Sequence, residues 1–392
     1  MMKRVDSIDV IRAIAIILMV PCHFILLLSP YEGPFEAVYT WGNEILGGLS
    51  APLFLFVVGL SQALSSFKNP PSETLFDKSG MRMVKRGIFI FVIGLLIEIP
   101  LEGAIYAWDI LPLIGVSLII LCVLRRSTPL TLFLCALCAF LIAPWLRGKV
   151  GYLSFWSPQM SPSDFVEGLP SLFTDPLNEY LHGLDPLLSN VAAGFFVTGY
   201  FPFFPWIMFP ILGFMVGKCS FGTQGTGRAS IAYLALGCCL VSIGLGVGVY
   251  VYHFGSANFE SGFIAPLTFF PITPPWLTVQ LGACLILFFI CRNFLDGTNR
   301  TGIGLDYCRV ISRYSFSVYL LHYLLAYWSV RIAGLVAGED GFQFLANAVS
   351  APTAWVLAVV ALVSFYFLFQ QCDKRDGKFT VEWFMKQLIP AV

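Results

Sequence analysis

Long apolar segments recur along the whole chain, and they restrict its fold more than any other feature. A helix needs about 20 apolar residues to cross a bilayer, where only helices and closed barrels satisfy their backbone hydrogen bonds. The suitable segments are 8–29, 46–66, 84–101, 105–124, 128–145, 190–217, 229–252, 274–292, 310–332 and 351–370. Only 12% of the residues are charged, about half the share in soluble domains. We therefore predict an all-α polytopic membrane protein with about ten transmembrane helices in one bundle.

The sixth apolar segment differs from the others because it contains three prolines, in "GYFPFFPWIMFPILGFMVG" (199–217). Proline breaks a helix interior, and a broken helix is tolerated in a membrane only where protein or water covers the freed backbone. We therefore predict a broken or re-entrant helix here. We interpret residues 1–372 as a single transmembrane domain, residues 147–189 as an outer lid or acceptor-binding insertion, and residues 373–392 as a cytoplasmic tail.

Basic residues are distributed unevenly between the loops that alternate along the chain. With the N-terminus inside, the cytoplasmic side holds nineteen of the 23 Lys and Arg residues, and the outer side holds only Arg147, Lys149 and Arg331. Because basic loops of membrane proteins stay in the cytoplasm, this bias predicts that both termini are cytoplasmic. The net charge of zero gives no sign of nucleic-acid binding.

One pair among the 11 cysteines, Cys135 and Cys138, has the C-x-x-C spacing of redox and metal sites. No histidine and no second pair accompanies it, and nearly all the cysteines lie in apolar segments. Cysteine behaves in such surroundings as a small hydrophobic residue. We therefore predict no metal site.

The first apolar segment contains "DVIRAIAIILMVPCH" (9–23), in which ionisable side chains interrupt apolar ones. Eleven residues turn an α-helix by about three turns plus 20° and advance it by about 16 Å, so Arg12 and His23 lie on one stripe. Asp9 lies one turn before Arg12 and is placed to pair with it. Ionisable groups in a membrane usually face a cavity or a partner, so the stripe is typical of a polar pathway. Two simpler interpretations are that Arg12 reaches the headgroups and that His23 is a hydrogen-bonded helix residue.

A second polar face occurs in the ninth segment, "RVISRYSFSVYLLHYLLAYW" (309–328). Ser315, Tyr319 and His322 fall on one side of a helix. The rise along the helix places Ser315 about 10 Å from His322, too far for a base to activate a nucleophile directly. We interpret the serine as a packing or hydrogen-bonding residue, and His322 either as a second pathway residue or as a structural one.

Polar residues also gather near the predicted outer ends of the early segments: Asn43, Glu98, Glu102 and Asp109. No basic residue lies near the three carboxylates in the sequence. Beside a cavity, these groups would hold an amine or hydroxyl acceptor, or they would orient His23. The alternative interpretation is an acidic rim on short outer loops.

Five basic residues are predicted at the cytoplasmic ends of the third to fifth segments: Arg82, Lys85, Arg86, Arg125 and Arg126. Arginine and lysine commonly bind phosphate groups, so this basic rim is a candidate site for an anionic, nucleotide-like donor. Membrane topology also places basic residues on this side, so the rim alone does not identify a ligand.

Six blocks of the sequence together carry a family resemblance. They are "RVDSIDVIRAIAIILMVPCH" (4–23), "SAPLFLFVVGLSQAL" (50–64), "KRGIFIFVIGLL" (85–96), "WDILPLIGVSLIIL" (108–121), "FPFFPWIMFPILGFMVGK" (201–218) and "SRYSFSVYLLHYLL" (312–325). In this order they resemble bacterial members of the heparan-alpha-glucosaminide N-acetyltransferase family, which falls within a wider superfamily of integral-membrane acyltransferases. The resemblance spans roughly residues 4–330, and the order of the blocks makes it specific.

The resemblance implies a ten-helix core with a central tunnel, which passes an acyl group from cytoplasmic acyl-CoA to a sugar amine or hydroxyl on the other side. In the superfamily, an arginine and a histidine with ten residues between them line the tunnel, and Arg12 and His23 match this spacing. The histidine is taken as the catalytic base and the arginine as a donor-positioning residue. In the animal lysosomal enzymes the catalytic histidine comes from the loop after this helix, whereas this chain has no histidine between His23 and His182. This departure favours His23 as the base and leaves the acceptor open.

We therefore predict a membrane-bound, acetyl-CoA-dependent N- or O-acetyltransferase of the bacterial inner membrane. His23, Arg12 and Asp9 form its catalytic group, and the basic rim binds the donor. The predicted acceptor-binding residues are Asn43, Glu98, Glu102, Asp109, Trp206 and His322. The expected partners are acyl-CoA, a sugar or glycan, and the lipid bilayer, and a homodimer is left open.

Two interpretations from other classes compete with this one. A secondary transporter or a lipid or glycan permease would use the Arg12–His23 stripe as a proton or substrate relay. A structural or assembly subunit would have no chemistry of its own. Stabilisation of the protein by acetyl-CoA would favour the enzyme, and substrate flux across vesicles would favour the transporter.

Overall fold

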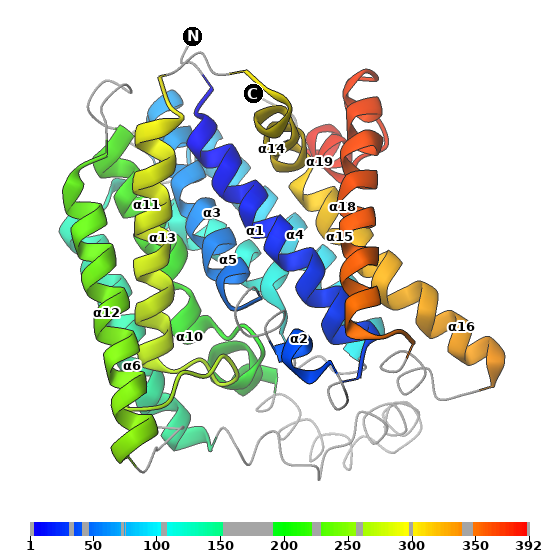
Figure 1. The fold of residues 1–392 in the computed structure, drawn as a ribbon. Helices are drawn as coiled ribbons and strands as arrows, with labels where there is room; N and C mark the ends of the chain where they lie inside the picture. Colours follow the sequence, from blue (N-terminus) through cyan, green and yellow to red (C-terminus); the bar gives the residue numbers. More distant parts are fainter. Residues whose placement is uncertain are drawn as a thin grey trace, which may run out of the picture. The chain divides into compact units, whose positions relative to one another are not determined.

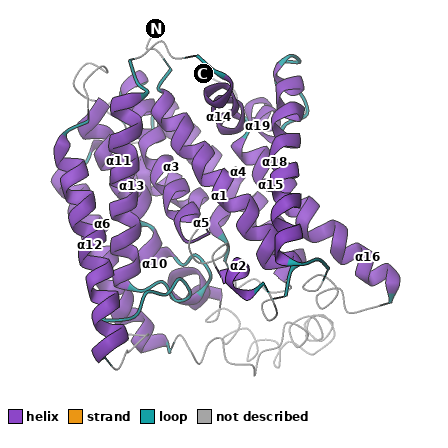
Figure 2. Cartoon of the chain, viewed as in Figure 1, coloured by secondary structure: helices purple, strands orange, loops and turns teal. Residues whose placement is uncertain are grey.

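The computed structural model describes most of the chain, and every regular element in the described part is a helix (Figure 2). The described residues are 4–30, 35–40, 47–71, 74, 76–102, 108–151, 191–221, 229–255, 262–297, 301–338 and 348–389. Within them no strand occurs. The all-α prediction is confirmed.

The helices follow the predicted apolar segments closely. The long helices are α1 (Asp6–Leu28), α3 (Gly48–Lys68), α4 (Lys78–Glu102), α5 (Ile110–Val123), α6 (Pro129–Val150), α11 (Met208–Phe221), α12 (Ile231–Phe254), α13 (Pro274–Phe294), α14 (Ile303–Arg313) and α18 (Ala351–Asp373). The shorter elements are α2 (Glu36–Thr40), η2 (Leu124–Arg126), η3 (Gly194–Thr198), α10 (Phe203–Trp206), α15 (Ser315–Tyr323), η4 (Leu324–Trp328), α16 (Ser329–Ala337) and α19 (Val381–Leu388). Each predicted segment therefore contains a described helix.

Seven helical stretches in the described part are long and apolar enough to cross a membrane. They correspond to α1, α3, α6, residues 191–221, α12, α13 and α18. The chain is an integral membrane protein. Three other predicted segments are also helical, but α5 has only 14 residues, α4 begins with several charged residues, and the ninth segment is divided. The full count of about ten spans stays a prediction.

The chain forms two compact units. The first unit contains residues 1–57, 223–237 and 283–392, and the second contains residues 58–222 and 238–282. The described part of residues 373–392, which we expected to be a tail, includes α19, and this helix packs against α15 within the first unit. Whether the chain functions as a single domain stays a prediction.

In the first unit, α1 is the central helix and packs against α14, α15 and α18 (Figure 1). Its apolar side chains are almost fully buried, including Ile11, Ile16 and Ile25. In a membrane, such side chains stabilise the fold mainly by van der Waals packing between helices, because the surrounding lipid chains are equally apolar. The helix ends at Leu28, where the hydroxyl of Ser29 donates to the carbonyl of Ile25 at 2.7 Å. Packing on several neighbours thus holds the predicted polar stripe in a fixed place.

The ninth predicted segment, 310–332, is not one continuous helix. Helix α14 ends at Arg313 and α15 begins at Ser315, because Tyr314 between them leaves the helical conformation at φ −107° and ψ 29°. The hydroxyl of Tyr314 donates to Asp373 at 2.7 Å, and its ring stacks on Phe369. The break is therefore held by residues at the end of α18, far away in the sequence.

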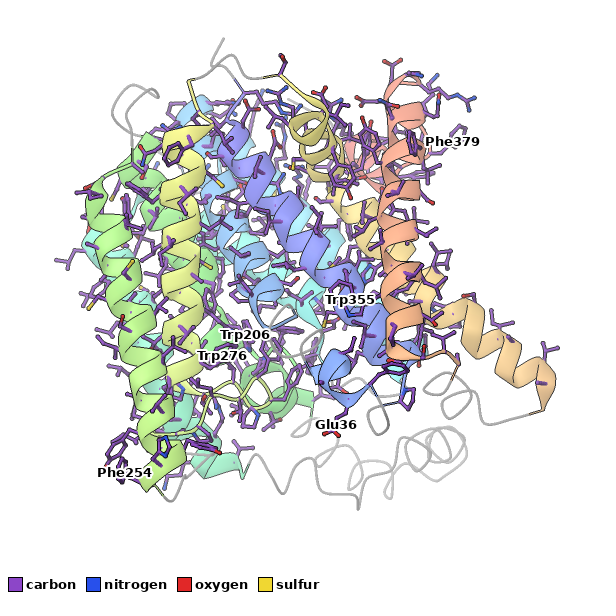
Figure 3. The ribbon with its side chains drawn as sticks, viewed as in Figure 1. Glu36, Trp206, Phe254, Trp276, Trp355 and Phe379 are labelled. Carbon is purple, nitrogen blue, oxygen red and sulfur yellow. The ribbon has the colours of Figure 1, made fainter. Side chains whose placement is uncertain are left out.

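In the second unit, the proline-rich sixth segment is broken, as predicted. After η3, the chain continues through α10, in which Phe204 has an extended ψ of 122°, and then through α11. The side chain of Trp206 is fully buried here (Figure 3). Its ring packs against Phe201, Phe209 and Phe269. Aromatic packing covers the region where prolines interrupt the helix.

Candidate active site

Both ionisable residues of the predicted stripe lie on α1, and a serine of α14 joins its first half. Arg12 Nη1 donates to Ser312 Oγ at 3.0 Å, and Ser312 Oγ donates to Asp9 Oδ1 at 2.7 Å. A hydroxyl can accept one hydrogen bond while it donates another, so Ser312 bridges the two residues that we expected to pair directly. Asp9 also accepts from Arg4 Nε at 2.5 Å. The structure thus fixes Arg12 against α14.

An ion pair lies one turn before this bridge. Arg309 donates to both carboxylate oxygens of Asp6, at 2.8 and 2.9 Å. This bidentate hydrogen bonding raises the pKa of the Arg309 guanidinium, which stays charged. Arg4 also donates to the carbonyl of Arg309, at 3.1 Å. The pair ties the start of α1 to α14.

A second set of contacts ties α1 to the end of α13. The backbone and hydroxyl of Ser7 donate to Asp296 at 2.9 and 2.5 Å, and Arg292 donates to the same carboxylate at 2.8 Å. Ser7, Arg292 and Ser312 are all buried. Arg292 and Arg309 are two of the nineteen basic residues that the sequence places on the cytoplasmic side, and nothing else in the sequence distinguishes them. Arg292 lies only four residues before Asp296, but Ser7 and Asp296 are 289 residues apart and Asp6 and Arg309 are 303 residues apart. No local signal indicated these two long-range contacts.

At the other end of the stripe, His23 meets a second histidine. His23 Nδ1 lies 2.8 Å from His322 Nε2, and the two ring planes differ by only 19°. His322 is fully buried, and its Nδ1 lies 3.3 Å from the carbonyl oxygen of Val318, one turn earlier on α15. His23 itself is half-buried. The two candidate polar faces of the sequence are therefore in direct contact.

Two tyrosines pack around the histidine pair. The ring of Tyr319 meets His322 edge-on at a centroid distance of 5.2 Å. The ring centroid of Tyr323 lies 5.1 Å from that of His23 and 4.6 Å from that of His322. Aromatic rings at these distances restrict how an imidazole can turn. Ser315, which shares the predicted face, is half-buried and lies at the first position of α15.

The predicted basic rim lies in the second unit and is not uniform. Lys85, Arg86 and Arg126 are exposed, and Arg82 is half-buried. Arg125 is buried and donates to Asp77 at 2.8 Å and to Ser79 at 2.9 Å. Its guanidinium thus stabilises the turn before α4, so a role for Arg125 in donor binding would compete with this ion pair. The assignment of the rim to the donor stays a prediction.

The residues predicted for acceptor binding are only partly described. Asn43 and the side chains of Glu98 and Glu102 lie outside the described residues. Asp109 is the N-cap of α5, and its carboxylate accepts from the backbone of Ile110 at 2.6 Å. Trp206 contacts protein on its aromatic faces, as described above. Within the described part of the chain, no three His, Cys, Asp or Glu side chains are grouped to hold a metal.

The sequence matches a known protein family. The family described as heparan-alpha-glucosaminide N-acetyltransferase, catalytic, matches residues 4–254, which include Arg12, His23 and the broken sixth segment. Ser312 and His322 lie beyond the matched residues. No curated protein matches the chain. Because the match covers well over half of the sequence, the chain belongs to the heparan-alpha-glucosaminide N-acetyltransferase family and is an acetyltransferase-type enzyme of the membrane.

Proposed function

We propose that the protein transfers an acetyl group from acetyl-CoA on the cytoplasmic side to an amine or hydroxyl of a sugar or glycan on the outer face. The observation that carries this proposal is the family match over residues 4–254. The contact between His23 and His322 supports it, because a half-buried imidazole is a suitable base beside a reacting amine or hydroxyl.

His23 is the proposed general base. It takes the proton from the acceptor while the acceptor nitrogen or oxygen bonds to the carbonyl carbon of the thioester. The carbon–sulfur bond then breaks, and the sulfur leaves as the CoA thiol after it takes the proton back from His23. Proton transfer by a positioned side chain accelerates such reactions by about 10²- to 10⁴-fold.

Arg12 is the proposed donor-positioning residue. Its guanidinium is anchored by Ser312, so its direction is fixed before any ligand binds. Preorganised donors of this kind are more effective than mobile ones, because they are not reordered during the reaction. Asp9 holds Ser312 in turn, and we propose that it acts through Arg12 rather than on the donor itself.

The exposed residues of the basic rim are proposed to bind the phosphates of the donor. Arg82, Lys85 and Arg86 have the i, i+3 and i+4 spacing that places three side chains on one face of α4. Arg126 is exposed at the turn after α5. For the acceptor, we propose Asn43, Glu98, Glu102, Asp109, Trp206 and His322 from their predicted position near the outer face. Both termini are proposed to be cytoplasmic.

The test uses the full-length protein, purified and reconstituted in lipid vesicles, with labelled acetyl-CoA and a panel of amino sugars and glycans. His23→Ala should lower acetyl transfer by about 10²- to 10⁴-fold. His253→Ala is the matched control, because His253 is an exposed histidine at the end of α12. Acetyl-CoA should raise the unfolding temperatures of the wild-type protein, His23→Ala and His253→Ala by the same amount.

Two results would contradict the proposal. Full activity of His23→Ala would remove His23 from the mechanism. Failure of acetyl-CoA to stabilise the wild-type protein, together with substrate flux across the vesicle membrane, would favour a transporter instead.

A further inference from the structure

We propose that His322 is a positioning residue for the reaction, which holds His23 in the tautomer that has its proton on Nδ1 and its basic lone pair on Nε2. This inference rests on the proposed role of His23 as the base. It gives the acceptor role proposed above for His322 a specific form: both ring nitrogens are engaged within the protein, so His322 acts on the acceptor through His23.

A backbone carbonyl determines which ring nitrogen of His322 carries the proton. Its Nδ1 lies 3.3 Å from the carbonyl oxygen of Val318. A carbonyl oxygen can only accept a hydrogen bond, so Nδ1 must carry a proton. A neutral imidazole carries one proton, and its other nitrogen is then an acceptor. In a neutral His322, Nε2 therefore presents a lone pair.

The surroundings of His322 determine its charge. The ring is fully buried, and in the described part of the chain the side chains that hydrogen-bond or pack against it are His23, Tyr319 and Tyr323, none of which carries a negative charge. A buried cation without an anionic partner is costly. The surroundings thus favour the neutral ring, in which Nδ1 carries the proton and Nε2 the lone pair.

The tautomer of His322 determines the tautomer of His23. Its Nδ1 lies 2.8 Å from the Nε2 lone pair of His322. Two lone pairs at this distance would repel, so His23 Nδ1 must donate. A neutral His23 then has its lone pair on Nε2, the ring nitrogen opposite the pair. This nitrogen is the one that can take a proton from an acceptor.

The two imidazoles are held in place by aromatic packing, and their hydrogen bond is kept when His23 becomes protonated. Tyr323 packs against both imidazoles, and Tyr319 packs against His322. When His23 takes a proton, its Nδ1–H still donates to His322, so the new charge develops next to an acceptor. The carboxylate of a Ser-His-Asp triad performs the same task, and the wrong tautomer there costs about 10⁴-fold in turnover. Here a second imidazole replaces the carboxylate.

The tautomer can be measured directly by nitrogen-15 magnetic resonance on the full-length protein in lipid vesicles. The chain has only four histidines, which keeps the spectrum simple. His182→Gln and His253→Gln identify the signals of the other two. We expect wild-type His23 and His322 both to be neutral with a protonated Nδ1 and an unprotonated Nε2. In His322→Leu, the His23 signals should shift toward a protonated Nε2. A protonated Nε2 on neutral His23 in the wild-type protein would overturn the inference.

Kinetics provide the second test. His322→Leu should lower kcat by about 10²-fold or more, with an unchanged KM for acetyl-CoA, because only the base is misplaced. His322→Gln should recover much of the loss, because its amide oxygen can accept from His23 Nδ1. Wild-type kcat in a folded His322→Leu protein would overturn the inference while His23→Ala still tests the proposed function. An active His23→Ala protein would instead remove the proposed function and this inference together.

Discussion

Within each of the two units, the helices are held together by a different kind of interaction. In the first unit, buried charged and hydroxyl side chains link helices, as in the bidentate pair of Asp6 with Arg309. In the second unit, helices approach each other at glycines. A Cβ atom built on Gly59 would lie 2.1 Å from the carbonyl oxygen of Pro210, and one built on Gly115 would lie 2.6 Å from that of Gly87. Small residues let helix backbones approach closely in a membrane, where packing contributes much of helix association.

This difference indicates which substitutions should destabilise each unit and which unit carries the functional ionisable groups. Buried ionisable groups are costly in a membrane and are usually retained for function, and the first unit carries most of those described, including Asp9, Arg292 and His322. The second unit depends on complementary shape. We therefore expect changes of volume to damage the second unit and changes of charge or hydrogen bonding to damage the first.

The largest effect is expected from Gly59→Ala. The added methyl group would overlap the backbones of Pro210 and Phe214, which cannot move aside as a side chain can. Overpacking of this kind costs about 3 kcal/mol or more. The loss of stability is measured as a fall in the unfolding temperature in detergent. This temperature is determined from the fraction of protein that stays monodisperse after heating.

The matched control for this change is Gly246→Ala on α12, where an added Cβ meets nothing within 4 Å. Alanine is favoured over glycine inside a helix by about 1 kcal/mol, so this protein should be unchanged or slightly more stable. Equal stability of the two variants would show that glycine contacts do not hold the second unit together.

The next largest effect is expected from Asp6→Asn in the first unit. The change leaves Arg309 with a neutral partner in a site where the Asp6 side chain is only 10% exposed. We expect a loss of about 2 kcal/mol in the free energy of unfolding. Asp306→Asn is the control, because Asp306 is 59% exposed and lies 3.5 Å from the same arginine. Its loss should stay below about 0.5 kcal/mol. A larger loss for Asp306→Asn would contradict the importance of burial.

Local sequence patterns predicted the helices well, but they did not predict the contacts between distant segments. Apolar runs located every described long helix except α14, most of which lies before the predicted segment 310–332. Prolines located the break before α11, and spacing placed Arg12 and His23 on one helix. These features depend on nearby residues. The contact of His23 with His322 joins positions 299 residues apart, and no periodicity records it.

The division of the ninth segment illustrates the same limit. Its composition resembles one continuous span, so the sequence predicted a single helix over 310–332. The break at Tyr314 depends on Asp373, which binds both Tyr314 and Arg313. Ser312 was also missed as a bridge, because a serine beside an arginine gives no sign of which helix it will meet.

A smaller effect is expected from Ser312→Ala. The change removes the hydroxyl that connects Arg12 to Asp9, and the two hydrogen bonds contribute about 1–2 kcal/mol together. If Arg12 positions the donor, KM for acetyl-CoA should rise about fivefold while kcat changes little. Ser315→Ala, three residues further on, is the control and should alter neither value. A wild-type KM for acetyl-CoA in Ser312→Ala would contradict the proposal that Arg12, anchored by Ser312, positions the donor.

The smallest effect is expected from Glu382→Ala, which tests whether α19 supports the start of α15. The carboxylate of Glu382 accepts from the backbone of Phe316 at 2.8 Å and from the backbone and hydroxyl of Ser317 at 3.1 and 2.5 Å. It therefore caps a helix whose first amides have no helical partner, and loss of such a cap costs about 1 kcal/mol.

The same change also tests how far the histidine contact depends on the rest of α15. Because His322 lies in the second turn of that helix, kcat should fall only about twofold in Glu382→Ala, and the unfolding temperature should fall slightly. Lys386→Ala, an exposed change on the same α19, should leave both values unaltered. A loss of kcat as large as that of His322→Leu would mean that the cap, rather than packing by Tyr319 and Tyr323, holds the two imidazoles together.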